Sequence, residues 1–297
     1  MSSANTTTIL KQIDSFPPLP ATVNRVMEIT GNPESSANEL MQAILPDLAM
    51  CASILKTANS AFFGRPRSVC SIQEAIVVLG FQEIRNIVLT QAMFNSFQKF
   101  RNTNKKNIDA LWQHSLTCGL AARIIASHNR QNRHPPSQLY IAGLIHDIGK
   151  LIMLSALPNS YNQVFELAEK LRYSFFPEEE ETFGISHDTA GMRLLNRWLF
   201  PDQFCFSAGY HHCPDHAPEG ATFPLIIQMA DILSHILQTG ESLDGKELLE
   251  MIHDFTPAIT QLWVHYDLNW QAEDIDIWLS ELRASLEDES VFSLFNA

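Results

Sequence analysis

The stretch Tyr140-Ile-Ala-Gly-Leu-Ile-His146-Asp147-Ile-Gly-Lys150-Leu-Ile-Met-Leu154 decides how the rest of the chain is interpreted. Its apolar run predicts a buried helix, yet it contains a His-Asp pair and a lysine. Burying charged groups in such a place costs several kcal/mol unless the charges are paired or bind a metal ion. The stretch therefore predicts a buried polar site rather than an ordinary core helix.

Further histidines and one aspartate, each in or beside an apolar helical segment, extend this set. Imidazole nitrogens and carboxylate oxygens are the ligands that divalent transition metals take from proteins, and two such ions need roughly six to eight protein ligands. The candidates are His114, His146, Asp147, His187, His211, His212 and Asp231. The count predicts a site for two metal ions that share one carboxylate.

Each candidate has a simpler interpretation when it is taken alone. Asp231 also fits a paired core acid, and His211-His212 also fit a helix end, where histidine favours the helix dipole. The order and spacing of the whole set favour the metal site. The histidines outside the set are interpreted as surface or hydrogen-bonded residues: His128, His134, His216, His235, His253 and His265.

Composition limits the class of protein. The 297 residues are 45% hydrophobic and 18% charged, which is ordinary for a soluble globular protein. A net charge of -13 argues against a general nucleic-acid surface. Five cysteines without a CxxC motif favour a reducing compartment, and neither a signal-peptide pattern nor an uninterrupted apolar run of about 18 residues is present. We expect a cytoplasmic protein that does not span a membrane.

Helical periodicity and helix-capping patterns recur along the chain, without an alternating strand pattern. Ser36-Ala-Asn-Glu39 is a capping-box pattern, and Gly80 is placed to end the helix that begins at Ile72. The polar, basic segment Lys99–Asn107 predicts a boundary or hinge. We therefore predict an all-α protein with an N-terminal helical part (residues 8–98), a metal-binding helical core (107–240) and a C-terminal helical extension (241–297).

The order of the candidate ligands resembles the HD-domain metallophosphohydrolase superfamily over about residues 108 to 238. Segments upstream resemble more specifically the HDOD family, a bacterial signalling branch of that superfamily. They are Pro17-Pro-Leu-Pro20, Ile54-Leu-Lys-Thr-Ala-Asn-Ser-Ala61, Ser71-Ile-Gln-Glu-Ala-Ile76 and Leu79-Gly80. The resemblance implies an HD-domain-like helical bundle with an additional N-terminal helical subdomain.

The resemblance also implies roles for the candidate residues. Asp147 would bridge two ions of iron, manganese or zinc and take part in catalysis. One ion would be held by His114, His146 and Asp231, and the other by His187, His211 and His212. Lys150 has two open interpretations: a catalytic contact to a substrate phosphate, or a helix-end lysine that reaches solvent.

Two functions follow from the resemblance. The superfamily implies hydrolysis of a nucleotide or cyclic dinucleotide phosphoester, whereas HDOD proteins are generally regulatory modules, in which the metal site would be structural, ligand-sensing or redox-sensing. The HD-GYP branch cleaves cyclic di-GMP, but Cys213-Pro-Asp-His-Ala-Pro218 stands where its Gly-Tyr-Pro segment would be, and Ala110 offers no carboxylate for a third ion. The expected partners are a small phosphorylated ligand, a signalling protein and a second copy of the chain.

Overall fold

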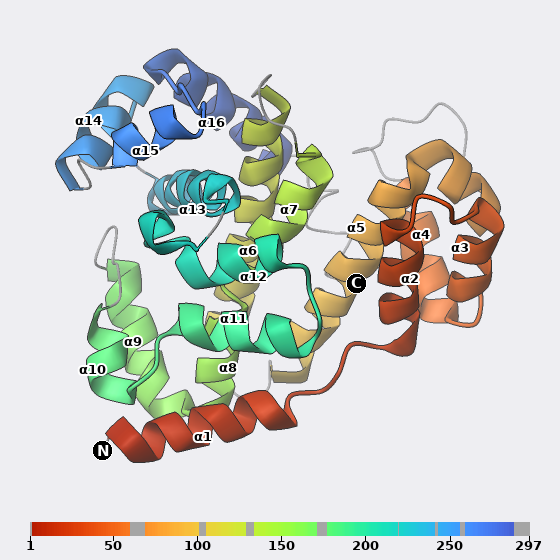
Figure 1. Cartoon of the computed structure of the whole chain (residues 1–297), viewed down its shortest axis with the longest axis horizontal. Coiled ribbons are helices and arrows are strands. Elements are labelled where there is room, and N and C mark those ends of the chain that lie inside the picture. The colour runs from red at the N-terminus through yellow and green to blue at the C-terminus, as the bar shows by residue number, and fades with distance from the viewer. Residues whose placement is uncertain are drawn as a thin grey trace. The chain divides into compact units, whose positions relative to one another are not determined.

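The computed structural model describes residues 2–59, 69–100, 105–128, 134–170, 177–218, 220–240, 243–255 and 259–287. Within these ranges every regular element is a helix, so the predicted all-α class is confirmed (Figure 1). Parts of three predicted features lie outside the described residues: Ser60 and Ala61 of the family-like segment, residues 101–104 of the hinge, and residues 288–297 of the C-terminal extension.

Sixteen α-helices and one short 3-10 helix (η2, Pro214–His216) are described. The α-helices are α1 (Ser2–Ser15), α2 (Ala21–Gly31), α3 (Ala37–Ile44), α4 (Leu48–Ala58), α5 (Ile72–Phe100), α6 (Lys105–His128), α7 (Pro136–Ile145), α8 (Ile148–Ala156), α9 (Pro158–Lys170), α10 (Pro177–Phe183), α11 (His187–Arg197), α12 (Asp202–Tyr210), α13 (Thr222–Thr239), α14 (Gly245–Phe255), α15 (Ile259–His265) and α16 (Ala272–Glu287).

The helices form two compact units. One consists of Pro17–Lys99 with Ala284–Ala297, and the other of Met1–Phe16 with Phe100–Arg283. The N-terminal helix α1 thus packs with the unit that contains all the candidate ligands, a grouping that the sequence did not indicate. The three-part division stays a prediction.

The smaller unit shows the local signals that the sequence predicted. Ser36 accepts a hydrogen bond from the Glu39 backbone N–H (3.2 Å), and Glu39 accepts one from the Ser36 N–H (2.7 Å), which completes the capping box that starts α3. Gly80, with φ of 80°, interrupts α5 where the sequence predicted a helix end. Glycine adopts this left-handed conformation without the steric cost of a Cβ atom.

The core of the larger unit depends on glycines at two helix crossings. A Cβ atom on Gly143 would lie 2.7 Å from the Cys118 carbonyl oxygen, so α7 approaches α6 too closely for any side chain there. A Cβ atom on Gly149 would lie 1.8 Å from the His187 carbonyl oxygen, so α8 is equally close to the start of α11. These crossings bring the helices that carry the candidate ligands together.

The central stretch is not one helix, and this corrects the sequence prediction. Helix α7 ends at Ile145 and α8 begins at Ile148, because Asp147 adopts φ of -97° and ψ of 14°. Successive residues of a continuous α-helix point about 100° apart. The break allows the neighbouring side chains of His146 and Asp147 to face the same point, which a continuous helix would prevent.

The apolar stretch Pro136–Ala156 is long and apolar enough to cross a membrane, although the sequence analysis expected no such stretch. However, 89% of it is buried within the protein, which is typical of the core of a soluble protein. Its apolar side chains pack against protein instead of lipid, as the predicted buried helix requires.

Helix α1 packs across α8, α10 and α11 (Figure 1). The Thr6 hydroxyl donates to the Phe183 carbonyl at the end of α10 (2.9 Å). Arg197, in the last turn of α11, donates to the carbonyls of Ile13 (3.2 Å) and Phe16 (2.7 Å) at the end of α1. These hydrogen bonds join α1 to α10 and to α11.

Candidate metal centre

The structure brings the other six predicted ligands together around Asp147, which is fully buried. The two carboxylate oxygens of Asp147 face different groups of side chains. Oδ2 lies 3.4 Å from the Nε2 atoms of both His114 and His146. Oδ1 lies 3.4 Å from Nε2 of His187 and 3.7 Å from Nε2 of His211. Asp147 is therefore placed between two half-sites, as a bridging carboxylate would be.

The first half-site is formed by side chains from α6, from the α7–α8 break and from α13. Asp231 Oδ1 lies 2.9 Å from His114 Nε2 and 3.6 Å from His146 Nε2. The Nε2 atoms of His114 and His146 are 3.4 Å apart. Two donor atoms at about 2.1 Å from one ion, at angles of about 90–109°, are about 3.0–3.4 Å apart. These separations fit donors that share one transition-metal ion.

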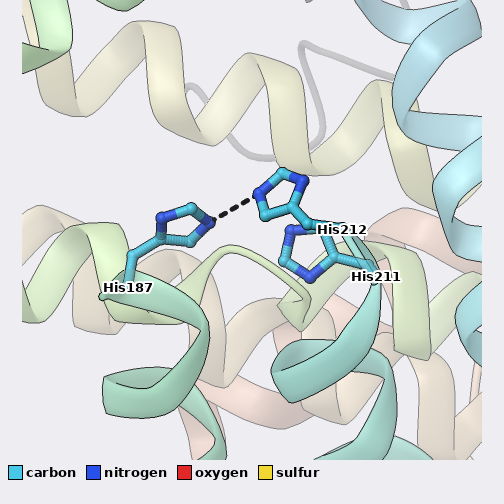
Figure 2. Close-up of side chains that lie close together, drawn as sticks. All are labelled: His187, His211 and His212. Carbon is cyan, nitrogen blue, oxygen red and sulfur yellow. Dashed lines mark hydrogen bonds between the residues drawn. The ribbon is translucent and has the colours of Figure 1, made fainter. Parts of the chain in front are cut away.

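The second half-site consists of three histidines (Figure 2). His187 extends from the start of α11, and His211 and His212 follow α12, so that the rings meet from two helices. The Nε2 atoms of His187 and His212 are 3.0 Å apart. With Oδ1 of Asp147, this half-site offers four donors, a common number for a transition-metal ion.

Hydrogen bonds on the far side of three of the rings fix which nitrogen faces the centre. Each of these Nδ1 atoms lies within hydrogen-bond distance of an acceptor: the Gly143 carbonyl for His146 (2.7 Å), Glu179 for His187 (2.8 Å), and the Ser207 (3.1 Å) and Ala208 (3.0 Å) carbonyls for His211. If Nδ1 donates its proton, Nε2 keeps its lone pair for the centre. Metal-binding histidines usually make such outer hydrogen bonds.

Buried polar atoms without a hydrogen-bond partner test whether an ion fits. Asp147 Oδ1 and His211 Nε2 both face the centre and make no hydrogen bond. Leaving such groups unsatisfied costs about 1–3 kcal/mol each, and more for charged groups. Metal coordination would satisfy both atoms. Together with the donor separations in the first half-site, this shows that the residues present fit two bound ions.

The charge states also suit metal binding. Burial lowers the pKa of His114 to about 4 and that of His211 to about 3, so both rings are neutral ligands near pH 7. Burial would raise the pKa of Asp147, but His146 and then Lys150 hold it well below its usual value. Burial would likewise lower the pKa of His146, but the Asp147 carboxylate raises it well above its usual value. An ion that binds here would displace the proton of His146.

Lys150 does not reach solvent, so one of its two interpretations is excluded. Its side chain is buried, and its Nζ atom lies 2.6 Å from Asp147 Oδ2. Burial lowers the pKa of Lys150, but the charge of Asp147 outweighs this effect and raises it. The ammonium group therefore stays charged beside the Asp147 carboxylate.

Glu179 was not predicted from the sequence as a site residue. It lies in α10 and is fully buried. Its Oε2 atom accepts a hydrogen bond from the His187 backbone N–H (2.6 Å) and lies 2.8 Å from His187 Nδ1. Its Oε1 atom accepts a hydrogen bond from the Tyr161 hydroxyl (2.6 Å). Burial would raise the pKa of Glu179, but His187 and Tyr161 hold it below its usual value. Glu179 is one of four consecutive acids, Glu178 to Glu181, and no sequence signal distinguishes it from the others.

His235 was interpreted as a residue outside the site, yet its Nε2 atom lies 3.3 Å from Asp231 Oδ1. Its ring is 4.6 Å from that of His114. A signal was present in the sequence, because residues four apart lie on the same face of a helix. His235 follows Asp231 by four residues in α13.

The HDOD domain, as a family, matches residues 16–214 of this sequence, which is more than half of the chain. The chain belongs to the HDOD family. The match includes α2 to α5 as well as six of the seven predicted ligands, all except Asp231. The resemblance on which the sequence analysis relied is thus confirmed.

Solved structures share the fold across nearly the whole chain. A candidate signal transduction protein from Marinobacter aquaeolei is 20% identical, with a TM-score of 0.73. The match covers 99% of this chain and 66% of that one. A candidate phosphohydrolase from Shewanella amazonensis is 16% identical, with a TM-score of 0.71, over 98% of both chains. At these identities the likeness establishes the fold alone.

An uncharacterised protein of Treponema pallidum is 25% identical over 244 residues, which cover 82% of this chain and 46% of that protein. The HDOD chain described here therefore spans about half the length of the curated relative that it matches.

Proposed function

We propose that this HDOD protein is a signal-transduction protein that binds two divalent transition-metal ions and hydrolyses a nucleotide or cyclic dinucleotide phosphoester. The observation that carries the proposal is the position of Asp147, whose two oxygens face separate sets of ligand nitrogens. The structural likeness to a candidate phosphohydrolase supports the choice of reaction. An imidazole-rich ligand set favours iron, manganese or zinc over magnesium.

Each half-site would contribute to the same reaction. Two ions bound here would supply an activated water and would neutralise charge that develops on a phosphate. Asp147, His114, His146 and Asp231 would hold one ion. Asp147, His187, His211 and His212 would hold the other.

Lys150 would bind the phosphate. Its ammonium group is charged, buried and at the centre of the site, 2.6 Å from Asp147. A fixed positive charge of this kind stabilises negative charge that develops in a transition state, and it does so more strongly where water is excluded. We therefore assign Lys150 a catalytic role in which it neutralises a non-bridging phosphate oxygen.

One observation favours a second candidate function, a non-catalytic regulatory module. The Lys150 ammonium group contacts Asp147 Oδ2, the oxygen that the first ion would need. A lysine in that position competes with the ion, which suits a site that senses metal, ligand or redox state. Both candidates agree with a cytoplasmic protein that recognises a small phosphorylated ligand, a signalling protein or a second copy of itself.

A turnover assay on metal-loaded protein separates the two candidates. The panel contains nucleoside monophosphates, cyclic mononucleotides and cyclic dinucleotides, with Asp147→Asn and Lys150→Met beside the native chain. Hydrolysis that is lost in Asp147→Asn and reduced in Lys150→Met supports the hydrolase. Stable binding of two ions without turnover of any member of the panel supports the regulatory module.

A further inference from the structure

The first half-site has a neighbour that the predicted ligand set leaves out. His235 follows Asp231 by one turn of α13, and its side chain is 43% exposed, whereas that of Asp231 is 11% exposed. His235 thus lies at the edge of the buried cluster. Its ring reaches from the solvent side towards the same carboxylate that His114 and His146 face.

The distances around Asp231 place His235 with the ligands. Asp231 Oδ1 lies 2.9 Å from His114 Nε2, 3.3 Å from His235 Nε2 and 3.6 Å from His146 Nε2. The ligand atoms of His114, Asp231 and His235 all lie within 4.8 Å of one another. Three imidazoles therefore present Nε2 to one buried carboxylate oxygen.

A plain hydrogen bond from His235 to Asp231 is a weaker explanation of this arrangement. The two atoms are 3.3 Å apart, slightly beyond the separation of about 2.7–3.2 Å that an N–H···O hydrogen bond prefers, and His114 Nε2 lies closer to the same oxygen, at 2.9 Å. Adjacent donors of one transition-metal ion are about 3.0–3.4 Å apart. The separation of 3.3 Å fits two ligands of one ion better than it fits a donor and its acceptor.

We propose that His235 is a further protein ligand of the ion in the first half-site. This inference rests on the proposed two-metal site and specifies how it works. The first ion would have five protein donors, from His114, His146, His235, Asp231 and Asp147. The second would have four, from His187, His211, His212 and Asp147.

The unequal donor numbers assign different tasks to the half-sites. If each ion accepted six ligands, the first half-site would leave fewer free positions than the second. The phosphate of a substrate would therefore bind at the second half-site, beside His187 and His212. The first half-site would hold its ion more tightly and change its ligands less during the reaction.

Cobalt titration of the full-length, metal-free protein tests the role of His235. The variants are His235→Ala, His235→Gln and, as a matched control, the exposed His253→Ala on α14. Glutamine can donate a hydrogen bond to Asp231 but has no imidazole nitrogen for the ion. Because the His235 side chain is 43% exposed, its replacement should leave the thermal melting temperature nearly unchanged, and melting curves check this.

We expect two Co²⁺ ions per native chain. In both His235 variants, one of the two dissociation constants should rise by about 10–100-fold. Affinity losses of this size are typical when a residue that supports a metal site is replaced. Added imidazole should restore binding in His235→Ala, where it can enter from solvent. The His253→Ala control should bind like the native protein.

Different results would overturn different parts of the proposal. If the native chain binds two ions and His235→Ala binds both with native affinity, the role of His235 is wrong while the two-metal site stands. If His235→Gln binds normally and His235→Ala does not, His235 only donates a hydrogen bond and is not a ligand. If the native chain binds no transition metal, the proposed function fails, and the His235 inference fails with it.

Discussion

Replacing Gly149 by alanine should separate α8 from α11 and thereby damage the second half-site. A Cβ atom at this position would lie 1.8 Å from the His187 carbonyl oxygen and 2.7 Å from the Gly191 nitrogen, both of which are backbone atoms. Backbone atoms cannot turn away as a side chain can. To reach an ordinary contact of about 3.5 Å, the two helices must move apart by roughly 1.5 Å.

The free-energy cost follows from this displacement. Overpacking a well-packed core typically costs about 1–3 kcal/mol, and a backbone clash of this severity belongs at the upper end. Alanine recovers up to about 1 kcal/mol through its higher helix propensity. We expect a net loss of about 2 kcal/mol, which lowers the melting temperature of a unit of this size by about 4–8 °C.

Metal binding should change mainly in the second half-site. The displaced residue is His187 itself, whose Nε2 atom lies 3.4 Å from Asp147 Oδ1. Affinity for the second ion should fall by about 10–100-fold. Affinity for the first ion should fall less, because His114 and Asp231 lie on α6 and α13, which do not form the α8–α11 crossing.

Gly191→Ala is the matched control, because it alters the same helix crossing from the other side. Its Cβ atom would lie 3.1 Å from the Gly149 nitrogen, a contact that a shift of a few tenths of an ångström relieves. This variant should melt close to the native temperature. The reasoning is refuted if Gly149→Ala melts within about 1 °C of the native protein and binds both ions with native affinity.

Three further substitutions probe other contacts. Glu179→Gln should lower the affinity for the second ion by about 10–100-fold, because it removes the charged acceptor that orients His187. Unchanged metal affinity would contradict this. Lys150→Met should destabilise the metal-free protein by about 3 kcal/mol, because it leaves the buried Asp147 carboxylate without its lysine. It should destabilise the metal-loaded protein by much less. Urea denaturation of both forms measures the difference. Leu199 has φ of 58° and is 86% exposed, so Leu199→Gly should stabilise the protein by up to about 1 kcal/mol in the same assay, and a loss of stability would show that the leucine side chain matters.

The sequence was informative where polar residues interrupt apolar helices. Burying a histidine or an aspartate has a large energetic cost, so each of the seven candidates is conspicuous in its segment, and the structure places all of them around Asp147. Glycine and proline marked helix ends for a similar reason, since both restrict where a helix can continue. Gly80 interrupts α5 where the sequence predicted.

Features that depend on tertiary packing could not be predicted from local patterns. The break at Asp147 contains no proline or glycine at the residue that turns, and the surrounding structure imposes it. Within the run of acids, Glu179 belongs to the site because Tyr161 and His187 contact its carboxylate. His235 was one of several isolated histidines until α13 placed it beside Asp231.

The most direct test of the two-metal site is the transition-metal content of each chain. Elemental analysis is made on protein purified without oxygen or chelator, for the native chain and for Asp147→Ala. A site bridged by Asp147 predicts about two ions of iron, manganese or zinc per native chain and loss of both in the variant, because that carboxylate serves both half-sites. A folded native protein that contains no transition metal, or an Asp147→Ala variant that retains two ions, would contradict the account.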